Sequence, residues 1–265
     1  MKRRKLWGIR NWTCYYGAGC GVEEYGRFDL AVLDGHYHPP LARRSGGRPL
    51  LLGYVSTGEV EEGGHLWPWV KEESFLLKKN GRWNTWIMDV RDLRWRELLL
   101  GRIIPSVLRR GFDGLFLDTV DSCLGLTLGD EEEQYSGIPL ALEGLIREIR
   151  DRFPRAVLAM NRGLPLLPAV AGVLDCVVIE GLYSEYAGPE KGYRKVPRET
   201  RTLLLEQLAR GLEADPDLTV LTLDYDGNEE RKLAREAVSF SRVRGFIPYV
   251  GNYRLDQIFL DALEG

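Results

Sequence analysis

Eight short runs of apolar residues recur along the chain, and each is followed by polar or charged residues. Short apolar runs bounded by turn residues are typical of strands that are buried on both faces of a parallel sheet. They predict strands at residues 6–9, 30–33, 50–55, 115–117, 156–160, 176–179, 218–223 and 245–250.

Between several of these runs, apolar residues recur at every third or fourth position, which is the spacing of a helix with one buried face. The pattern predicts helices at residues 95–110, 138–153, 197–214, 229–243 and 256–263. Pro105 lies inside the first of them and predicts a kink there, because proline has no N–H to donate to the preceding turn.

Eight buried strands with intervening helices, in about 250 residues, are typical of the α/β fold called a (β/α)8 or TIM barrel. The alternative is an open doubly wound sheet, which usually has fewer strands and a phosphate-binding loop.

No linker or change of composition divides the chain, so we expect one domain over residues 1–265. Residues 60–92 are too long for a plain crossover after the third strand. They predict an elaborated loop and hairpin over the barrel mouth, with an extra strand at residues 86–90.

The composition is that of a globular protein, with 44% hydrophobic and 28% charged residues among 265. A net charge of −3 does not favour a nucleic-acid partner. No apolar run approaches the roughly 20 residues of a membrane helix, so we expect no membrane association. No apolar core follows the basic start, Lys2 to Lys5, which predicts a cytoplasmic location unless a signal peptide has been removed. Scarce Gln and Asn beside abundant Arg, Glu and Leu favour a thermophilic source.

The four cysteines show no C-x-x-C pair and no zinc-binding spacing. Cys14 and Cys20 are close enough in sequence to form a disulfide, although the reduced state is favoured in a cytosol. Cys176 lies in an apolar run, as expected for a small core residue.

Polar residues, most of them acidic, follow the predicted strands at the point where each strand ends. They are Asp34, Glu59, Asp118, Asp121, Glu180, Asp224 and Asp226, together with Asn11, Asn161 and Asn252. In a barrel the carboxyl ends of all strands meet at one face, so we expect these side chains to converge. The segment 111–121 is the most informative, because a glycine turn and an apolar run lead directly to Asp118, Thr119 and Asp121. For one Asp alone, capping of the next helix would be the simpler explanation.

Several chemistries lack their motif in this chain. No strand end carries the Lys of a Schiff-base aldolase, and there is no phosphate-binding loop, dinucleotide fingerprint or G-x-S-x-G elbow. We therefore expect no cofactor. Crowded carboxylates serve either a hard-metal site or glycoside hydrolysis, in which one carboxylic acid protonates the leaving oxygen and another attacks the sugar or activates water. Crowding raises the pKa of one member, which keeps it protonated near neutrality while another stays ionised.

Aromatic residues near the same face offer surfaces on which sugar rings could stack. They are Trp12, Tyr54, Tyr183, Tyr225 and Tyr249, and packing in the core or at the rim is the alternative for each. Asp34, His36 and His38 offer a metal site as a further alternative, because alternate residues of an extended segment face the same side. Pro39 and Pro40 follow directly, as in an ordinary loop, so we expect no metal.

Three segments together resemble one known family. Residues 53–59, 86–91 and 111–121 read GYVSTGE, WIMDVR and GFDGLFLDTVD. In sequence, order and spacing they are similar to motifs of the endo-α-1,4-polygalactosaminidase-like glycoside hydrolases, glycoside hydrolase family 114. The resemblance implies a barrel that cleaves an α-1,4-linked galactosamine polymer, with catalytic carboxylates after the fourth and sixth strands. Those positions are Asp118, assigned as nucleophile, and Glu180, assigned as general acid/base.

The first hypothesis is therefore a glycosidase acting on an α-linked amino-sugar polymer, whose ammonium groups suit an acidic cleft. The residues expected to bind substrate are Asp34, Tyr54, Glu59, Asp121, Asn161, Tyr183, Asp224, Tyr225 and Tyr249. The second hypothesis is a carbohydrate-binding barrel that has lost catalysis. The third is a metal-dependent hydrolase that uses Asp34, His36 and His38.

Overall fold

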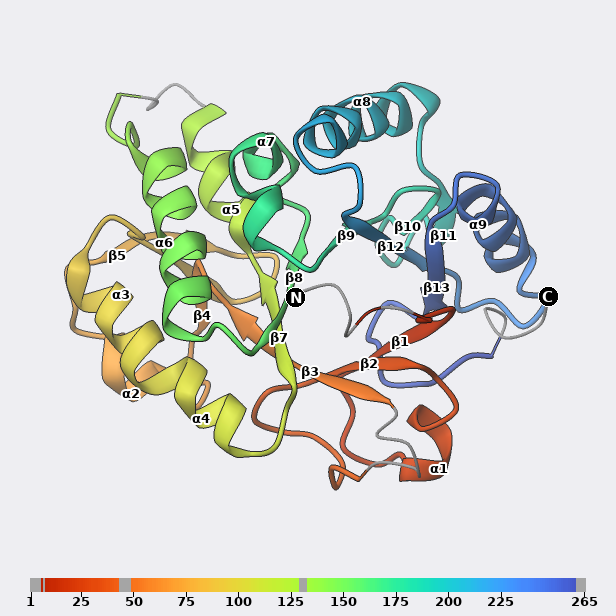
Figure 1. The fold of residues 1–265 in the computed structure, drawn as a ribbon, viewed down its shortest axis with the longest axis horizontal. Helices are drawn as coiled ribbons and strands as arrows, with labels where there is room; N and C mark the ends of the chain where they lie inside the picture. The colour runs from red at the N-terminus through yellow and green to blue at the C-terminus, as the bar shows by residue number, and fades with distance from the viewer. Residues whose placement is uncertain (1–5, 7, 43–48, 129–132, 261–265) are drawn as a thin grey trace.

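Eight parallel strands form one sheet that is nearly closed into a barrel (Figure 1). The computed structural model describes residues 6, 8–42, 49–128 and 133–260. In barrel order the strands are β1 (Trp12–Tyr15), β2 (Leu30–Leu33), β3 (Leu50–Ser56), β7 (Gly114–Asp118), β8 (Val157–Asn161), β9 (Cys176–Glu180), β12 (Thr219–Tyr225) and β13 (Ile247–Gly251). The first and last strands lie side by side, and the side-chain N–H of Trp12 donates to the Ile247 carbonyl at 3.0 Å. The predicted fold class is therefore confirmed.

Alternate residues of each strand face opposite sides of the sheet, and both sides are apolar. The inward-facing residues fill the barrel and come from all eight strands, for example Val32, Phe116, Ala159 and Val178. The outward-facing residues, such as Leu117, pack against the surrounding helices. Burial on both faces explains why these strands are continuous apolar runs in the sequence.

Helices cover the outside of the barrel (Figure 1). The longest are α6 (Ile138–Arg152), α8 (Arg198–Ala214) and α9 (Lys232–Arg242), and shorter ones are α1 (Val22–Tyr25), α5 (Val120–Gly125) and α7 (Leu167–Val170). The predicted helix at 95–110 is divided into α3 (Leu93–Leu98), a π-helical turn (Leu99–Ile103) and α4 (Ile104–Arg109). The π-helical turn comes directly before Pro105, at the position where a kink was predicted.

Two excursions leave the carboxyl ends of the barrel strands. After β3, the strands β4 (Glu59–Glu61), β6 (Thr85–Met88) and β5 (Leu76–Asn80) form an antiparallel sheet in that order, with α2 (Trp67–Val70) between β4 and β5. This confirms the elaborated loop and hairpin predicted within residues 60–92. After β9, β10 (Ser184–Tyr186) and β11 (Tyr193–Lys195) form a hairpin that was not predicted.

Two predicted elements are wrong. The first strand begins at Trp12 and not at residue 6, because Gly8 takes a φ of +79° and turns the chain within the predicted run. Leu6 and Ile9 are nevertheless buried against the barrel interior, while Trp7 lies outside the described residues. Residues 256–260 of the predicted last helix are not helical, and the preceding Leu255 has a φ of +52°. Residues 261–263 of that prediction lie outside the described part of the chain.

All four cysteines are buried and free. In the described residues, no helix combines the length and the apolar character needed to cross a bilayer.

Candidate active site

A cleft of about 1140 Å³ opens at the carboxyl ends of the barrel strands. Its floor is built from residues that continue the inward-facing positions of each strand to the strand end. These residues are Tyr16 after β1, Asp34 after β2, Tyr54 and Ser56 on β3, Asp118 on β7, Asn161 on β8, Glu180 on β9 and Tyr225 on β12. The cleft therefore brings together six of the predicted site residues on one floor.

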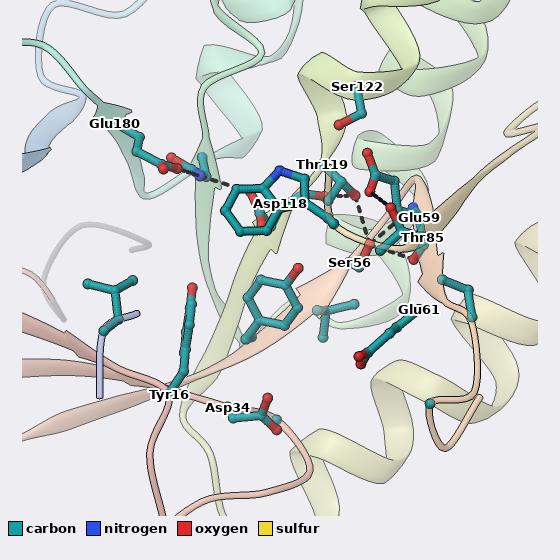
Figure 2. Close-up of a pocket in the computed structure, with 18 of the residues that line it drawn as sticks. Tyr16, Asp34, Ser56, Glu59, Glu61, Thr85, Asp118, Thr119, Ser122 and Glu180 are labelled. Carbon is teal, nitrogen blue, oxygen red and sulfur yellow. Dashed lines mark hydrogen bonds between the residues drawn. The ribbon is translucent and has the colours of Figure 1, made fainter. Parts of the chain in front are cut away.

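Asn161 joins the two predicted catalytic carboxylates. Its amide Nδ2 donates to Asp118 Oδ1 at 2.8 Å and to Glu180 Oε2 at 2.7 Å. The second oxygen of Glu180, Oε1, accepts a hydrogen bond from the Tyr225 hydroxyl at 2.7 Å. Asp118 and Glu180 thus approach the same nitrogen from opposite sides within the cleft (Figure 2). Three adjacent strands, β7, β8 and β9, supply this cluster.

The backbone makes the same turn after each member of the cluster. Thr119, Arg162 and Gly181 follow Asp118, Asn161 and Glu180, and their φ values are +63°, +54° and +63°. Left-handed backbone is unusual for a residue with a side chain, and for a β-branched one especially so. The turn ends the strand abruptly, so the functional side chain is the last one on the inner face of the barrel.

Hydrogen bonds from β3 hold the strained turn at Thr119. The Thr119 hydroxyl lies 2.8 Å from the Ser56 hydroxyl and accepts from the Gly58 backbone N–H at 2.9 Å. Figure 2 shows the contact between Ser56 and Thr119 beside Asp118. Thr57 also donates, through its backbone N–H, to the Asp118 carbonyl at 2.9 Å. The position of Asp118 therefore depends on contacts between neighbouring strands as well as on its own turn.

Electrostatics near the cluster favour a proton on Asp118. Burial, and then the negative charge of Glu180, raise the pKa of Asp118 to about 7 against the opposing effect of the hydrogen bond from Asn161. Asp118 therefore keeps its proton to higher pH than a free carboxyl would. Burial, and then the charge of Asp118, raise the pKa of Tyr54 well above the ordinary value. Burial, and then the charge of Glu180, do the same to the pKa of Tyr225. Both phenols therefore stay neutral donors.

Two further predicted acids line the cleft. Glu59, on β4, is buried and accepts hydrogen bonds from the Asn80 amide at 3.2 Å and from the Thr85 hydroxyl. Asp121 lies in the first turn of α5, where burial raises its pKa, and Arg162 Nη1 lies 3.7 Å from its Oδ2. Asp121 therefore lies at the start of a helix and also lines the cleft.

Three predicted substrate-binding residues do not line the cleft. Asp224 is fully buried, and its Oδ1 accepts the backbone N–H groups of Tyr183 and Ser184 at 2.6 and 2.8 Å. Tyr183 is directed towards α9, where its hydroxyl donates to Glu236 at 2.9 Å. Tyr249 is fully buried in the barrel interior. Each of these side chains is instead occupied in packing or in loop support.

The proposed metal ligands also fail to converge. His36 Nδ1 lies 3.1 Å from Arg110 Nη2, and the His36 ring stacks on His65 with centroids 3.9 Å apart. His38 Nδ1 contacts the carbonyl of its neighbour Pro39 at 2.8 Å. Within the described ranges, no three His, Cys, Asp or Glu side chains are grouped so as to hold a metal ion. Asp34, His36 and His38 are therefore held in other contacts and are not grouped as a set of ligands.

Some cleft residues were not predicted from the sequence. Tyr16 lines the cleft directly after β1. It was missed because the first strand was predicted to begin six residues too early. Trp83 and Tyr253 come from the β5–β6 turn and from the segment after β13. The tryptophan-rich composition of residues 60–92 was the only signal for Trp83, and it did not specify which tryptophan reaches the cleft.

Comparison with known proteins gives one family and several similar structures. A family model described as Glycoside-hydrolase family GH114 matches residues 10–263. The chain is similar to the glycoside hydrolase domain of PelA from Pseudomonas aeruginosa, with 26% identity, a TM-score of 0.77, and coverage of 95% of this chain and 98% of that one. Aspergillus fumigatus Ega3, solved in complex with galactosamine, shares the fold with 12% identity, a TM-score of 0.67, and coverage of 93% and 92%. An uncharacterized protein of Deinococcus radiodurans is 23% identical over 272 residues, which are 96% of this chain and 82% of that protein.

Proposed function

This chain belongs to glycoside hydrolase family GH114, and on that premise we propose that it cleaves an α-1,4-linked galactosamine polymer with Asp118 as nucleophile and Glu180 as general acid/base. The observation that carries the proposal is the hydrogen bonding of both carboxylates to the single amide nitrogen of Asn161 at the floor of the cleft. A polysaccharide substrate follows from the family itself. The sugar, the linkage and the roles of the two carboxylates are the parts that we propose.

The spacing of the carboxylates supports a retaining mechanism. The nearest oxygens of the two carboxylates lie 2.8 and 2.7 Å from one nitrogen, so these two oxygens are at most about 5.5 Å apart. Retaining glycosidases hold their carboxyl groups about 5–5.5 Å apart, whereas inverting ones leave about 6.5–9.5 Å for a water molecule. Asp118 would attack the anomeric carbon, and the leaving oxygen would take a proton from Glu180. Water would then release the sugar from Asp118, with Glu180 acting as the base.

The protonation of Asp118 bears on this sequence of steps. The pKa of Asp118 is raised, so Asp118 keeps a proton at mildly acidic pH. A galactosamine residue brings an ammonium group on the carbon next to the anomeric carbon. That positive charge beside Asp118 favours its ionised form, which is the form that attacks the anomeric carbon.

The charge of the cleft supports an amino-sugar substrate. Seven acidic residues line it, namely Asp34, Glu59, Glu61, Asp118, Asp121, Glu180 and Glu185, against four arginines, Arg82, Arg110, Arg162 and Arg254, so the formal charge of the lining is negative. Clustered negative charge in a cleft attracts a cationic polymer and disfavours an anionic one. Ega3 was solved with galactosamine, and we extend that sugar to this chain as part of the proposal.

Release of reducing ends from a soluble α-1,4-linked galactosamine polymer tests the proposal. Asp118→Asn and Glu180→Gln should each lower the rate by about 10³-fold or more, since each removes a reacting group. Asp151→Asn and Glu206→Gln make the same chemical changes at exposed positions on α6 and α8 and should leave the rate unchanged. Full activity in either cleft variant would overturn the assignment. Tight binding of the polymer by the wild-type protein, with no cleavage over long incubation, would instead favour a non-catalytic carbohydrate-binding barrel.

A further inference from the structure

Three aromatic side chains from separate parts of the chain meet at the mouth of the cleft. Trp83 lies in the turn between β5 and β6, Tyr253 follows β13, and Tyr186 ends β10. Trp83 stacks on Tyr253 with ring centroids 5.7 Å apart and planes 24° from parallel, and Tyr253 packs on Tyr186 at 4.3 Å. All three line the cleft. We call Trp83, Tyr253 and Tyr186 together the aromatic arch.

The contacts of the aromatic arch cross the barrel mouth. The sheet that carries Trp83 leaves the barrel after β3, whereas the other two residues follow β13 and β9. In the barrel order, β1 and β2 separate β13 from β3, and β7 and β8 separate β3 from β9. Figure 1 shows the β4–β6 sheet and the β10–β11 hairpin on opposite sides of the barrel. The aromatic arch therefore bridges the face on which the catalytic pair lies.

Cleft residues come from the barrel on both sides of this bridge. Asp34 and His36 follow β2 on one side, and Asp121 and Arg162 follow β7 and β8 on the other. A polymer that occupies both parts of the cleft at once must pass beneath the aromatic arch. A chain end could thread through, but an internal stretch could enter only if the arch opens.

The two sides of the aromatic arch differ in how firmly they are held. Tyr253 is fixed by its backbone N–H, which donates to the Tyr193 hydroxyl at 3.0 Å, and by its contact with Tyr186. Trp83 is half exposed, at 49%, and belongs to a turn whose residues 81–84 are all exposed. Stacking of Trp83 on Tyr253 is a contact between rings, which can separate without leaving a buried polar group unpaired. The natural opening point is therefore between Trp83 and Tyr253.

We propose that the aromatic arch determines how the enzyme attacks its polymer. It opens between Trp83 and Tyr253 to admit an internal stretch of glycan, closes over that stretch, and retains it through successive cuts. The inference rests on the proposed function, because it concerns the same cleft and the same polymer. It adds that Trp83 and Tyr253 set the number of cuts made in each encounter and not the chemistry of one cut.

The product pattern from an α-1,4-linked galactosamine polymer tests the role of Trp83. We expect the wild-type enzyme to release several short oligosaccharides for each new end left in the polymer. Trp83→Ala should lower that ratio by about three- to tenfold, the loss expected when one aromatic contact is removed. Its rate on short galactosamine oligomers, which do not span the arch, should change less than twofold. Trp83→Phe keeps a ring at this position and should restore most of the ratio.

A binding measurement separates retention from catalysis. In the inactive Asp118→Asn background, Trp83→Ala should speed the dissociation of a long labelled galactosamine oligomer by the same three- to tenfold. Leu140→Ala is the control, because Leu140 is an exposed apolar residue on α6 that is not among the residues lining the cleft. It should leave the product ratio unchanged. An active wild-type enzyme whose ratio and dissociation rate are not altered by Trp83→Ala would overturn the arch proposal. A wild-type enzyme that releases no reducing ends would instead refute the proposed function.

Discussion

Replacement of Asp118 by Asn should stabilise the folded protein near neutral pH while it abolishes hydrolysis. Burial and the charge of Glu180 raise the pKa of Asp118 to about 7, whereas an unfolded chain gives about 3.9. Between these values the folded state holds a proton that the unfolded state has released. The contribution of Asp118 to stability is therefore fully present below about pH 4 and is lost as the pH rises through about 7.

The size of the effect follows from the same difference in pKa. Each pH unit corresponds to about 1.4 kcal/mol, so an elevation from about 3.9 to about 7 gives a ceiling of about 4 kcal/mol. Asp118 is only partly shielded from solvent, and Asn brings a new donor beside the Asn161 amide. We therefore expect a gain of about 1–2 kcal/mol above pH 7. For a chain of this length, that gain raises Tm by about 2–8 °C.

Thermal and urea unfolding between pH 4 and pH 8 measure the effect. The advantage of Asp118→Asn over the wild type should be small at pH 4, grow through the interval, and level off above pH 7. Asp151→Asn, an exposed change on α6, should follow the wild-type curve at every pH. An advantage that is independent of pH, or an Asp118→Asn protein less stable than the wild type at pH 7.5, would refute the account of a buried Asp118 with a raised pKa.

Substitutions at three other residues test the hydrogen bonds of the site. Asn161→Ala removes a donor from both carboxylates and should lower kcat/KM by about 10²–10³-fold. It should also move the acidic limb of the pH–rate profile upward, because the pKa of Asp118 loses the bond that lowers it; an unshifted limb would contradict this. Tyr225→Phe should lower kcat by about tenfold on oligosaccharides with little change in Tm, since it deletes one hydrogen bond to Glu180. Thr119→Ala should lose about 1–3 kcal/mol in urea unfolding, and Thr119→Gly should recover about 1 kcal/mol of that loss, because glycine accepts the left-handed backbone. Equal losses would exclude strain at this turn.

Most of the barrel was predictable because a strand buried on both faces gives an uninterrupted apolar run. Seven of the eight strands lie within two residues of their predicted bounds. The first does not, because β1 has the sequence WTCY, whose hydroxyl groups made it look less apolar than residues 6–9. The hairpin after β9 has short strands that are partly exposed, so it has no such signal. Positive φ at Thr119 and Arg162 is also invisible in sequence, since neither residue type favours it.

The errors at the site have one further cause, which is the two-residue period of a strand. On β12, Leu221 and Leu223 face the barrel interior, so Tyr225 continues that face and reaches the cleft. Asp224 has the opposite parity, and its side chain therefore supports the loop behind Glu180. The same rule places Asp118 two residues after Phe116, Asn161 two after Ala159, and Glu180 two after Val178, all inward-facing positions. Counting acids at strand ends identified the right face of the barrel, but the parity of each position decides which of these acids reach the cleft.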